Sequence, residues 1–502
     1  MEDASSYFLG NLLSVGNSQT NSDYKNISPI SVVLQKNIRN IFFLCSTKIN
    51  NMKNLILFGL LACFSISCNT SEKIATPTVL KEAMTTQETP TAIEITEGEY
   101  TLVVEGFDWG AAASKVILSM EENVNAVNGE AFDVQVKRAT TCVELKPAEA
   151  EGKLKVLYAY ISDDKGERAA TGNYVTLVLY VAPFEPMNAP IKYFFQNPNC
   201  SGNQWIDFDL TISEKETNRV WNKEKDRIIP LVDEFDLSGR FTHQDITMTY
   251  ASFTPTTNAN KSPLIIWLHG AGEGGTDPSI ILLANRAANY AAPEIQAYFG
   301  GAYVLAPQSP TFWMDKGDGT YTRGEVNDKY NISLMALIED FVNNHPKIDK
   351  DRIYVGGCSN GGYMSLKLLL LRPDYFAAGF PSALAYHGAN LSNSDIEQIK
   401  DKPIWFIHSA DDPVTKASET VIPTYQKLIK AGSKNVHLSM FDHVVDITNQ
   451  FGGDAFHYNG HFSWIYSHTN KCQLDYDGLP VLVNGQPTTL MGWMASQRNS
   501  LK

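Results

Sequence analysis

Between residues 92 and 213, hydrophobic and polar positions alternate with a period of two. The alternation is clearest at residues 100–104, 154–160 and 175–181. Clusters of Asp, Gly, Asn and Thr separate these runs, at residues 163–166 and 171–173. Short alternating runs divided by turn residues are typical of antiparallel strands with one buried face. We therefore predict a β-sandwich of immunoglobulin size over residues 92–213.

From residue 214 onward the pattern changes to continuous apolar runs separated by helical periodicity. Four such runs lie at residues 264–268, 302–306, 352–355 and 403–407. Between two of them, Leu334, Leu337, Ile338 and Phe341 recur at steps of one, three and four residues, as on one face of a helix. Buried strands alternating with amphipathic helices indicate a parallel sheet covered on both faces. We predict an α/β fold over residues 214–502, closed by a helix near its end.

An apolar run near the N-terminus has the features of a secretory signal. Lys53 precedes about a dozen apolar residues, which are too few to span a membrane. The run ends in small residues and Cys68, after which the chain becomes polar. The segment resembles a bacterial lipoprotein signal, in which the cysteine after the cleavage site is acylated. Cys68 is therefore the predicted lipidation site, with Cys63 as a competing position.

This signal places the start of the natural protein at Met52 rather than at residue 1. Residues 1–51 are then an over-extended gene model, and 52–68 form the signal peptide. Residues 69–91 are rich in Thr, Glu, Lys, Ser and Pro, a composition typical of a flexible tether. The alternative is a retained anchor over residues 41–68, which two lysines interrupt.

Composition narrows the class of protein. The 55 acidic and 41 basic residues give a formal net charge of −14, which argues against nucleic-acid binding. Seven cysteines are too few for a disulfide scaffold in 502 residues. Cys142 and Cys200 both fall in the β-rich part, and the sequence leaves open whether they pair or stay as two thiols.

A candidate nucleophile follows one of the buried strands. The segment GGCSNGG contains the pattern G-x-S-x-G, with Ser359 between Gly357 and Gly361. A sharp turn from strand to helix lifts such a serine out of the sheet, and the glycines permit the crowded backbone. The bare pattern also occurs in ordinary glycine-rich turns. The strand before it and the helix after it favour the nucleophile.

The order of residues along the chain provides an independent test, because a nucleophile elbow should be followed by an acid and then a histidine. Asp412 stands after the next buried strand, and His461 lies in a glycine-containing loop further on. The adjacent Asp411 is a candidate helix cap, an interpretation that also applies to Asp412 itself. His443 and His457 are rival histidines for the role of general base.

Stabilisation of an oxyanion needs two aimed N–H donors. The backbone N–H of Asn360 follows the nucleophile, and that of Ala271 lies in the loop LHGAGEGG, which ends an earlier strand. This glycine-rich loop matches neither of the common phosphate-binding patterns. Nucleotide binding is therefore not predicted.

His457 and His461 have the i, i+4 spacing of a zinc site on a helix. The intervening Tyr-Asn-Gly disfavours a helix, and no third ligand is evident. We predict no metal site and no cofactor, because a serine, an acid and a histidine suffice for acyl transfer.

With these motifs together, the chain resembles bacterial α/β-hydrolase esterases that carry an N-terminal immunoglobulin-like domain. These are relatives of the polyhydroxybutyrate-depolymerase-like esterases and of the so-called predicted peptidases. The matching pieces are VEGFDWGAAASKVIL, LHGAGEGG, GGCSNGGYMS, HSADDPV and HFSW, within residues 92–500. The resemblance implies an α/β-hydrolase fold and a triad of Ser359, Asp412 and His461. Cys358 is similar to its counterpart in tannase-type enzymes, but Phe462 stands where those have a second cysteine.

These observations predict a serine hydrolase that cleaves carboxylic esters through an acyl-enzyme. The alternatives are a serine peptidase of the same fold and, from another class, a non-catalytic binding protein of the cell envelope. The expected partner is a small-molecule or carbohydrate-linked ester, with no nucleic acid and with membrane contact only through a lipid anchor. The expected location is the bacterial envelope or the medium. Acyl specificity, alcohol specificity and formation of a homo-oligomer are left open by the sequence.

Overall fold

The computed structural model describes residues 96–195 and 200–499. The predicted signal, Cys68 and the predicted tether lie outside the described residues. No helix within the described ranges is both long and apolar enough to cross a membrane.

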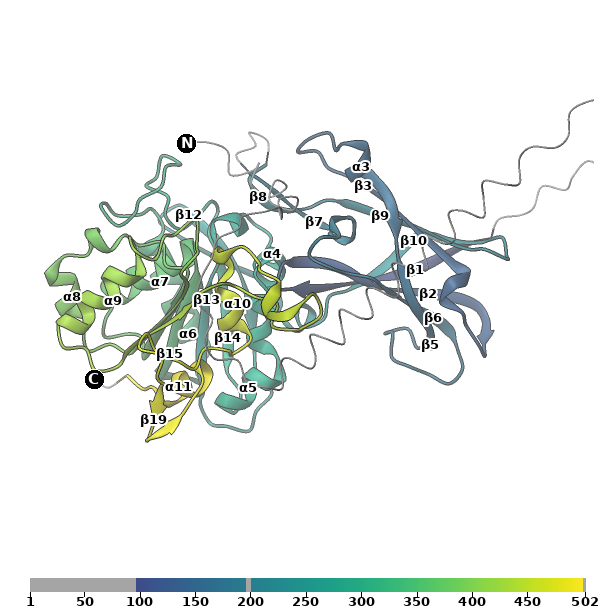
Figure 1. Ribbon diagram of the computed structural model, residues 1–502. Coiled ribbons are helices and arrows are strands. Elements are labelled where there is room, and N and C mark those ends of the chain that lie inside the picture. Colours follow the sequence, from purple (N-terminus) through teal and green to yellow (C-terminus); the bar gives the residue numbers. More distant parts are fainter. Residues whose placement is uncertain (1–95, 196–199, 500–502) are drawn as a thin grey trace, which may run out of the picture. The chain divides into compact units, whose positions relative to one another are not determined.

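The first part of the described chain consists mainly of β-strands, with one short α-helix, α3 (Pro147–Ala150), and is called the β-domain here (Figure 1). Hydrogen bonds join its strands in the order β4 (Glu151–Leu154), β3 (Phe132–Ala139), β9 (Asp207–Glu214), β10 (Arg219–Ile228), β1 (Thr96–Phe107), β2 (Gly110–Val124), β6 (Gly172–Leu179) and β5 (Val156–Ser162). Side chains from both halves of this sheet share one core, for example Leu102, Val134, Leu177 and Leu210. The two halves therefore enclose a common interior, as in a sandwich.

The boundary predicted at residue 213 is too early. β10 lies beyond it, yet it pairs in parallel with β1 over Thr96–Val103 and belongs to the first sheet. Trp221 of β10 is buried against Phe132, with ring centroids 6.1 Å apart. The β-domain therefore extends to Ile228, because its core is incomplete without the indole of Trp221.

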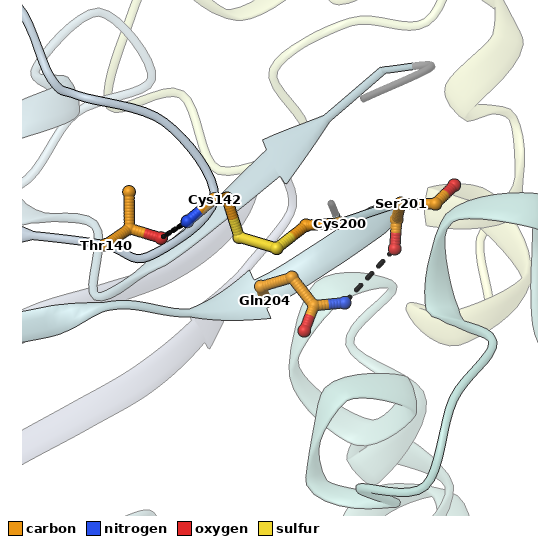
Figure 2. The surroundings of a disulfide bond; sticks show 5 residues. All are labelled: Thr140, Cys142, Cys200, Ser201 and Gln204. Atoms are coloured by element: carbon orange, nitrogen blue, oxygen red, sulfur yellow. Dashed lines mark hydrogen bonds between the residues drawn. A yellow bond between two sulfur atoms is a disulfide. The ribbon is translucent and has the colours of Figure 1, made fainter. Parts of the chain in front are cut away.

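Cys142 and Cys200, whose pairing the sequence leaves open, form a disulfide with a Cα–Cα distance of 5.5 Å (Figure 2). It joins the loop after β3 to the connection between β7 (Ile191–Phe194) and β8 (Gly202–Trp205), two strands that pair as an antiparallel hairpin. The two cysteines are separated by 58 positions. For a closed loop of that length, chain entropy gives a stabilisation of about 4 kcal/mol.

The remaining residues form the α/β-domain, whose eight-stranded sheet confirms the predicted α/β-hydrolase fold. The order is β11 (Asp236–His243), β12 (Ile246–Phe253), β14 (Tyr303–Gln308), β13 (Ser262–Leu268), β15 (Ile348–Cys358), β16 (Ala378–Ser382), β17 (Ile404–Ser409) and β18 (Val436–Phe441). β14 through β18 in this order are parallel, and β11 and β12 are antiparallel additions at one edge.

Helices cover both faces of this sheet, because the strands are apolar on both sides. On β13, Leu264, Ile266 and Leu268 join one core, and Ile265 and Trp267 join the other. The first face packs on α6 (Asn331–Asn344), α7 (Asn360–Leu371), α8 (Asn393–Ile399) and α9 (Val421–Lys430). The second packs on α4 (Ser279–Ala284), α5 (Pro293–Phe299), α10 (Trp464–His468) and α11 (Leu490–Ser496). The predicted closing helix is α11.

Candidate active site

The candidate residues gather at one edge of the α/β sheet. Ser359 follows β15, Asp412 follows β17, and Ala271 follows β13, while His461 lies in the long connection after β18. These strands are parallel, so their carboxyl ends meet at the same edge of the sheet. Active sites of open α/β sheets are formed at this edge.

Ser359 has a strained backbone, with φ of 55° and ψ of −110°. A non-glycine residue in such a conformation is uncommon and marks a site where the surroundings enforce it. The Ser359 N–H donates to the carbonyl of Ser382 on β16 at 3.0 Å. A Cβ added at Gly361 would lie 1.9 Å from the Leu268 carbonyl oxygen, so this position has no room for a side chain. The geometry is that of a nucleophile elbow.

Asp412 and His461 form a close hydrogen-bonded pair. Nδ1 of His461 lies 2.9 Å from Oδ2 and 3.0 Å from Oδ1 of Asp412. A Cβ on Gly460 would lie 2.2 Å from Oδ1 of Asp411, and this close approach brings the two loops together. Within the described residues, Nε2 of His461 has no hydrogen-bond partner. Its ring therefore has one nitrogen oriented by a carboxylate and the other available for a proton transfer.

The surroundings of Asp412 favour its ionised form. Burial alone would raise the pKa of Asp412, but His461 and hydrogen bonds from its own loop hold that pKa below its usual range. Thr415 donates to it through both its N–H and its hydroxyl, at 2.9 Å and 2.7 Å. Together with the hydrogen bond from His461, these two bonds fix the direction of the Asp412 carboxylate as well as its charge.

His408 and Thr415 are supporting residues that the sequence reasoning did not identify. His408 is fully buried on β17, and its Nε2 lies 3.5 Å from Oδ2 of Asp412. Burial lowers the pKa of His408 to about 4, and its Nε2–H donates to the Thr415 carbonyl at 2.7 Å. The segment HSADDPVT contains both residues, but a serine, threonine or histidine beside an acidic pair is too common a pattern to identify them.

The rival residues occupy other interactions. Asp411 accepts hydrogen bonds from Ser409 and from Nδ1 of His443, the latter at 2.8 Å. His457 stacks on His443 with ring centroids 4.2 Å apart, and its Nε2 lies 3.1 Å from the Asp454 carbonyl. The described contacts of these three side chains do not include Asp412.

The two candidate oxyanion donors each begin a helix. Asn360 is the first residue of α7, and Ala271 is the first of a 3₁₀ turn over Ala271–Glu273. An N–H at the first position of a helix has no partner within that helix and is free to bind an anion. The buried Asn360 side chain accepts a hydrogen bond from the Met314 N–H at 3.1 Å, which holds the start of α7 in place.

Trp313, in the segment after β14, is fully buried in the core of the α/β-domain. Among residues 96–195 and 200–499, no three His, Cys, Asp or Glu side chains are grouped to hold a metal ion.

Two protein-family models match parts of the chain. The model of the esterase Ig-like N-terminal domain matches residues 99–225. The model of the prolyl oligopeptidase family matches residues 311–386, which include Ser359 and α7. The first match covers the β-domain and includes β10 up to Lys225.

Curated relatives match shorter stretches. Poly(3-hydroxyalkanoate) depolymerase C of Paucimonas lemoignei is 28% identical over 137 residues, covering 26% of this chain and 29% of that protein. Acetylxylan esterase A of Emericella nidulans is 29% identical over 136 residues, covering 24% and 42%. A probable carboxylesterase of Arabidopsis thaliana is 24% identical over 184 residues, covering 32% and 66%. The chain therefore spans less than two thirds of the length of each of these relatives.

A solved structure described as a thermostable esterase matches the fold over 80% of this chain and 99% of its own, with 24% identity and a TM-score of 0.62. The chain thus has an α/β-hydrolase fold, and its residues 99–225 match the model of the esterase Ig-like N-terminal domain. The resemblance to esterases of this two-domain type, expected from the sequence motifs, is confirmed.

Proposed function

We propose that this protein is a serine hydrolase that cleaves carboxylic esters through an acyl-enzyme intermediate. The observation that carries this proposal is the hydrogen-bonded pair of Asp412 and His461, located at the same sheet edge as the strained Ser359. Support comes also from relatives that are named as esterases or as a depolymerase.

Acylation begins when Oγ of Ser359 attacks the ester carbonyl carbon. Nε2 of His461 takes the hydroxyl proton, and Asp412 stabilises the resulting imidazolium. The carbonyl oxygen becomes an oxyanion, which the N–H groups of Ala271 and Asn360 stabilise. As the tetrahedral intermediate collapses, the bond to the alcohol oxygen breaks, and His461 returns the proton to the departing alcohol.

Deacylation repeats these steps with water as the nucleophile. His461 removes a proton from a water molecule that attacks the acyl carbon, and the same two N–H groups stabilise the second oxyanion. Collapse of this intermediate releases the carboxylic acid and restores the Ser359 hydroxyl. The cycle consumes one water and requires no cofactor.

A serine peptidase is the second candidate, because the prolyl oligopeptidase model matches the segment around Ser359. The two reactions differ in their leaving groups. An amine must be protonated as it departs, whereas an alkoxide or phenolate leaves more readily. A triad with two oxyanion donors therefore cleaves esters with less additional positioning of the substrate.

We predict that kcat/KM for an ester exceeds that for an amide with the same acyl group by at least about 100-fold. The measurement compares 4-nitrophenyl acetate with 4-nitroacetanilide, and a longer acyl pair repeats the comparison. The Ser359→Ala protein supplies the background rate for each substrate. Turnover of the amide at a rate equal to or above that of the ester would replace the esterase assignment by the peptidase one.

The proposed setting of this reaction is the bacterial envelope, with the chain anchored through an acylated Cys68 or released into the medium. The support is the lipoprotein-like sequence that ends at Cys68. Such an anchor holds the catalytic domain near the membrane surface without inserting it, and the substrate is a small-molecule or carbohydrate-linked ester.

A further inference from the structure

The β7–β8 hairpin of the β-domain packs directly on the loop that carries Ala271. This loop, residues 269–275, is called the oxyanion loop here. A Cβ added at Gly202 on β8 would lie 2.3 Å from the Gly272 carbonyl oxygen. One added at Gly272 would lie 2.8 Å from the ring of Tyr193 on β7. The hairpin and the oxyanion loop are therefore in contact without any intervening space.

Among the residues that the structure describes, one polar side-chain pair connects the two at this contact. Nδ2 of Asn203, on β8, donates to Oε1 of Glu273 at 2.7 Å. Glu273 is only 4% exposed, and Asn203 is the one side chain among the described residues that hydrogen bonds to its carboxyl group. The other oxygen, Oε2, lies 2.8 Å from the position of a Cβ on Gly270. The Glu273 carboxyl group thus bridges the hairpin and the first turn of the oxyanion loop.

The oxyanion loop needs such external support. It contains glycine at positions 270, 272, 274 and 275, and glycine leaves the backbone with many accessible conformations. An oxyanion donor is effective only when its N–H is already aimed at the developing charge. Ala271 and Glu273 are the first and last residues of one 3₁₀ turn, so fixing the Glu273 side chain restricts the direction of the Ala271 N–H.

We propose that Asn203 and Glu273 are positioning residues through which the β-domain holds the Ala271 N–H in its oxyanion-binding direction. The inference rests on the proposed function, because it assigns a role in stabilising the same oxyanion. It makes the β-domain a part of the catalytic device rather than an independent module.

The ionisation of Glu273 provides a second way to test this role, through the pH dependence of kcat. Burial raises the pKa of Glu273 to about 7, although Asn203 and the Gly270 N–H oppose the shift. The titratable groups that face it are the Cys358 thiol from β15 and the Tyr193 phenol from β7. Burial raises the pKa of the Cys358 thiol, and partial burial against the oxyanion loop raises the pKa of the half-exposed Tyr193 phenol, so both are neutral near pH 7. Ionisation of Glu273 therefore places an uncompensated negative charge beside the oxyanion loop.

The test uses the full chain and an aryl acetate as substrate. Asn203→Ala is expected to lower kcat about 10-fold or more with KM changed less than twofold, because the lost interaction acts on the transition state. Gln204→Ala is the matched control, since Gln204 is the next residue on β8 and its amide donates to the Ser201 carbonyl (Figure 2). We expect wild-type kcat for this control.

A double-mutant cycle tests whether the two residues act as one unit. Glu273→Ala is expected to lower kcat as much as Asn203→Ala does, and the double variant to lose no more than either single one. Wild-type kcat in a folded Asn203→Ala protein, or losses that multiply in the double variant, would overturn the proposal.

Glu273→Gln tests the role of Glu273 while its hydrogen bond with Asn203 is kept. The glutamine keeps the acceptor for Asn203 but cannot ionise, so kcat at pH 6 is expected to stay within about threefold of wild type. The wild-type kcat is expected to decline above pH 7 as Glu273 ionises, and this decline should vanish in the variant. Identical pH profiles would contradict the proposal, even where Asn203→Ala fails to fold. Ester hydrolysis that survives Ser359→Ala would instead contradict the proposed function itself.

Discussion

Ser359→Ala is expected to abolish ester hydrolysis, with kcat/KM falling by about 10³-fold or more and the fold intact. The variant removes the atom that forms the bond to the acyl carbon, while the methyl group fits where the hydroxymethyl group was. The measurement is kcat/KM on an aryl ester, with the thermal midpoint of unfolding as the control for folding.

A folded Ser359→Ala protein with wild-type turnover would contradict the assignment of Ser359 as the nucleophile. If the variant loses activity and its thermal midpoint of unfolding also falls sharply, then the strained turn does not tolerate alanine. In that case Ser359→Gly, which relieves the positive φ, repeats the test with the same expected loss.

Asp412→Asn is expected to lower kcat by about 10⁴-fold. The neutral amide can no longer stabilise an imidazolium, and it can hold the His461 ring in the wrong tautomer. KM is expected to change little, because Asp412 is buried and contacts His461 rather than the substrate. The measurement is the pH profile of kcat for the wild type and the variant.

Asp411→Asn is the matched control for this prediction. The two aspartates are adjacent in sequence, but Asp411 pairs with Ser409 and His443, whereas Asp412 pairs with His461. We expect Asp411→Asn to keep kcat within a few-fold of wild type. The reverse outcome, a large loss at Asp411 and a small one at Asp412, would show that the acid has been assigned to the wrong residue.

The fold of the α/β-domain could be predicted because its signals are local. Each buried strand is a continuous apolar run, and the G-x-S-x-G pattern lies where one of these runs meets a helix. Parallel strands bring their carboxyl ends to one edge, so residues far apart in the chain, such as Ser359 and Asp412, could be expected at one site. The order of residues along the chain and a glycine-containing loop favoured His461, but they did not separate it from His443 and His457.

The domain boundary could not be placed as well, because it depends on pairing between distant segments. β10 follows residue 213 in the chain but pairs with β1, more than a hundred residues earlier. Nothing in its own composition marks it as part of the first sheet rather than the second. The Cys142–Cys200 disulfide could not be predicted for the same reason, because the positions of two cysteines in the sequence do not give the distance between them in the fold.

The contact of Asn203 with Glu273 could not be predicted from the sequence for a related reason. The two residues are 70 positions apart, on different domains, and neither belongs to a recognisable motif for contact between domains. A glutamate in a glycine-rich loop is normally solvent-exposed, but here Glu273 is buried and the hairpin contacts its carboxyl group through Asn203.

The most direct test of the account is to identify the residue that becomes covalently modified during turnover. The full-length protein is treated with a slowly hydrolysed aryl ester or a fluorophosphonate, quenched in acid, digested and analysed by mass spectrometry. The account predicts one adduct per chain, on Ser359 within the GGCSNGG segment, and no adduct in Ser359→Ala. An adduct on another residue, or continued ester turnover with Ser359 unmodified, would contradict it.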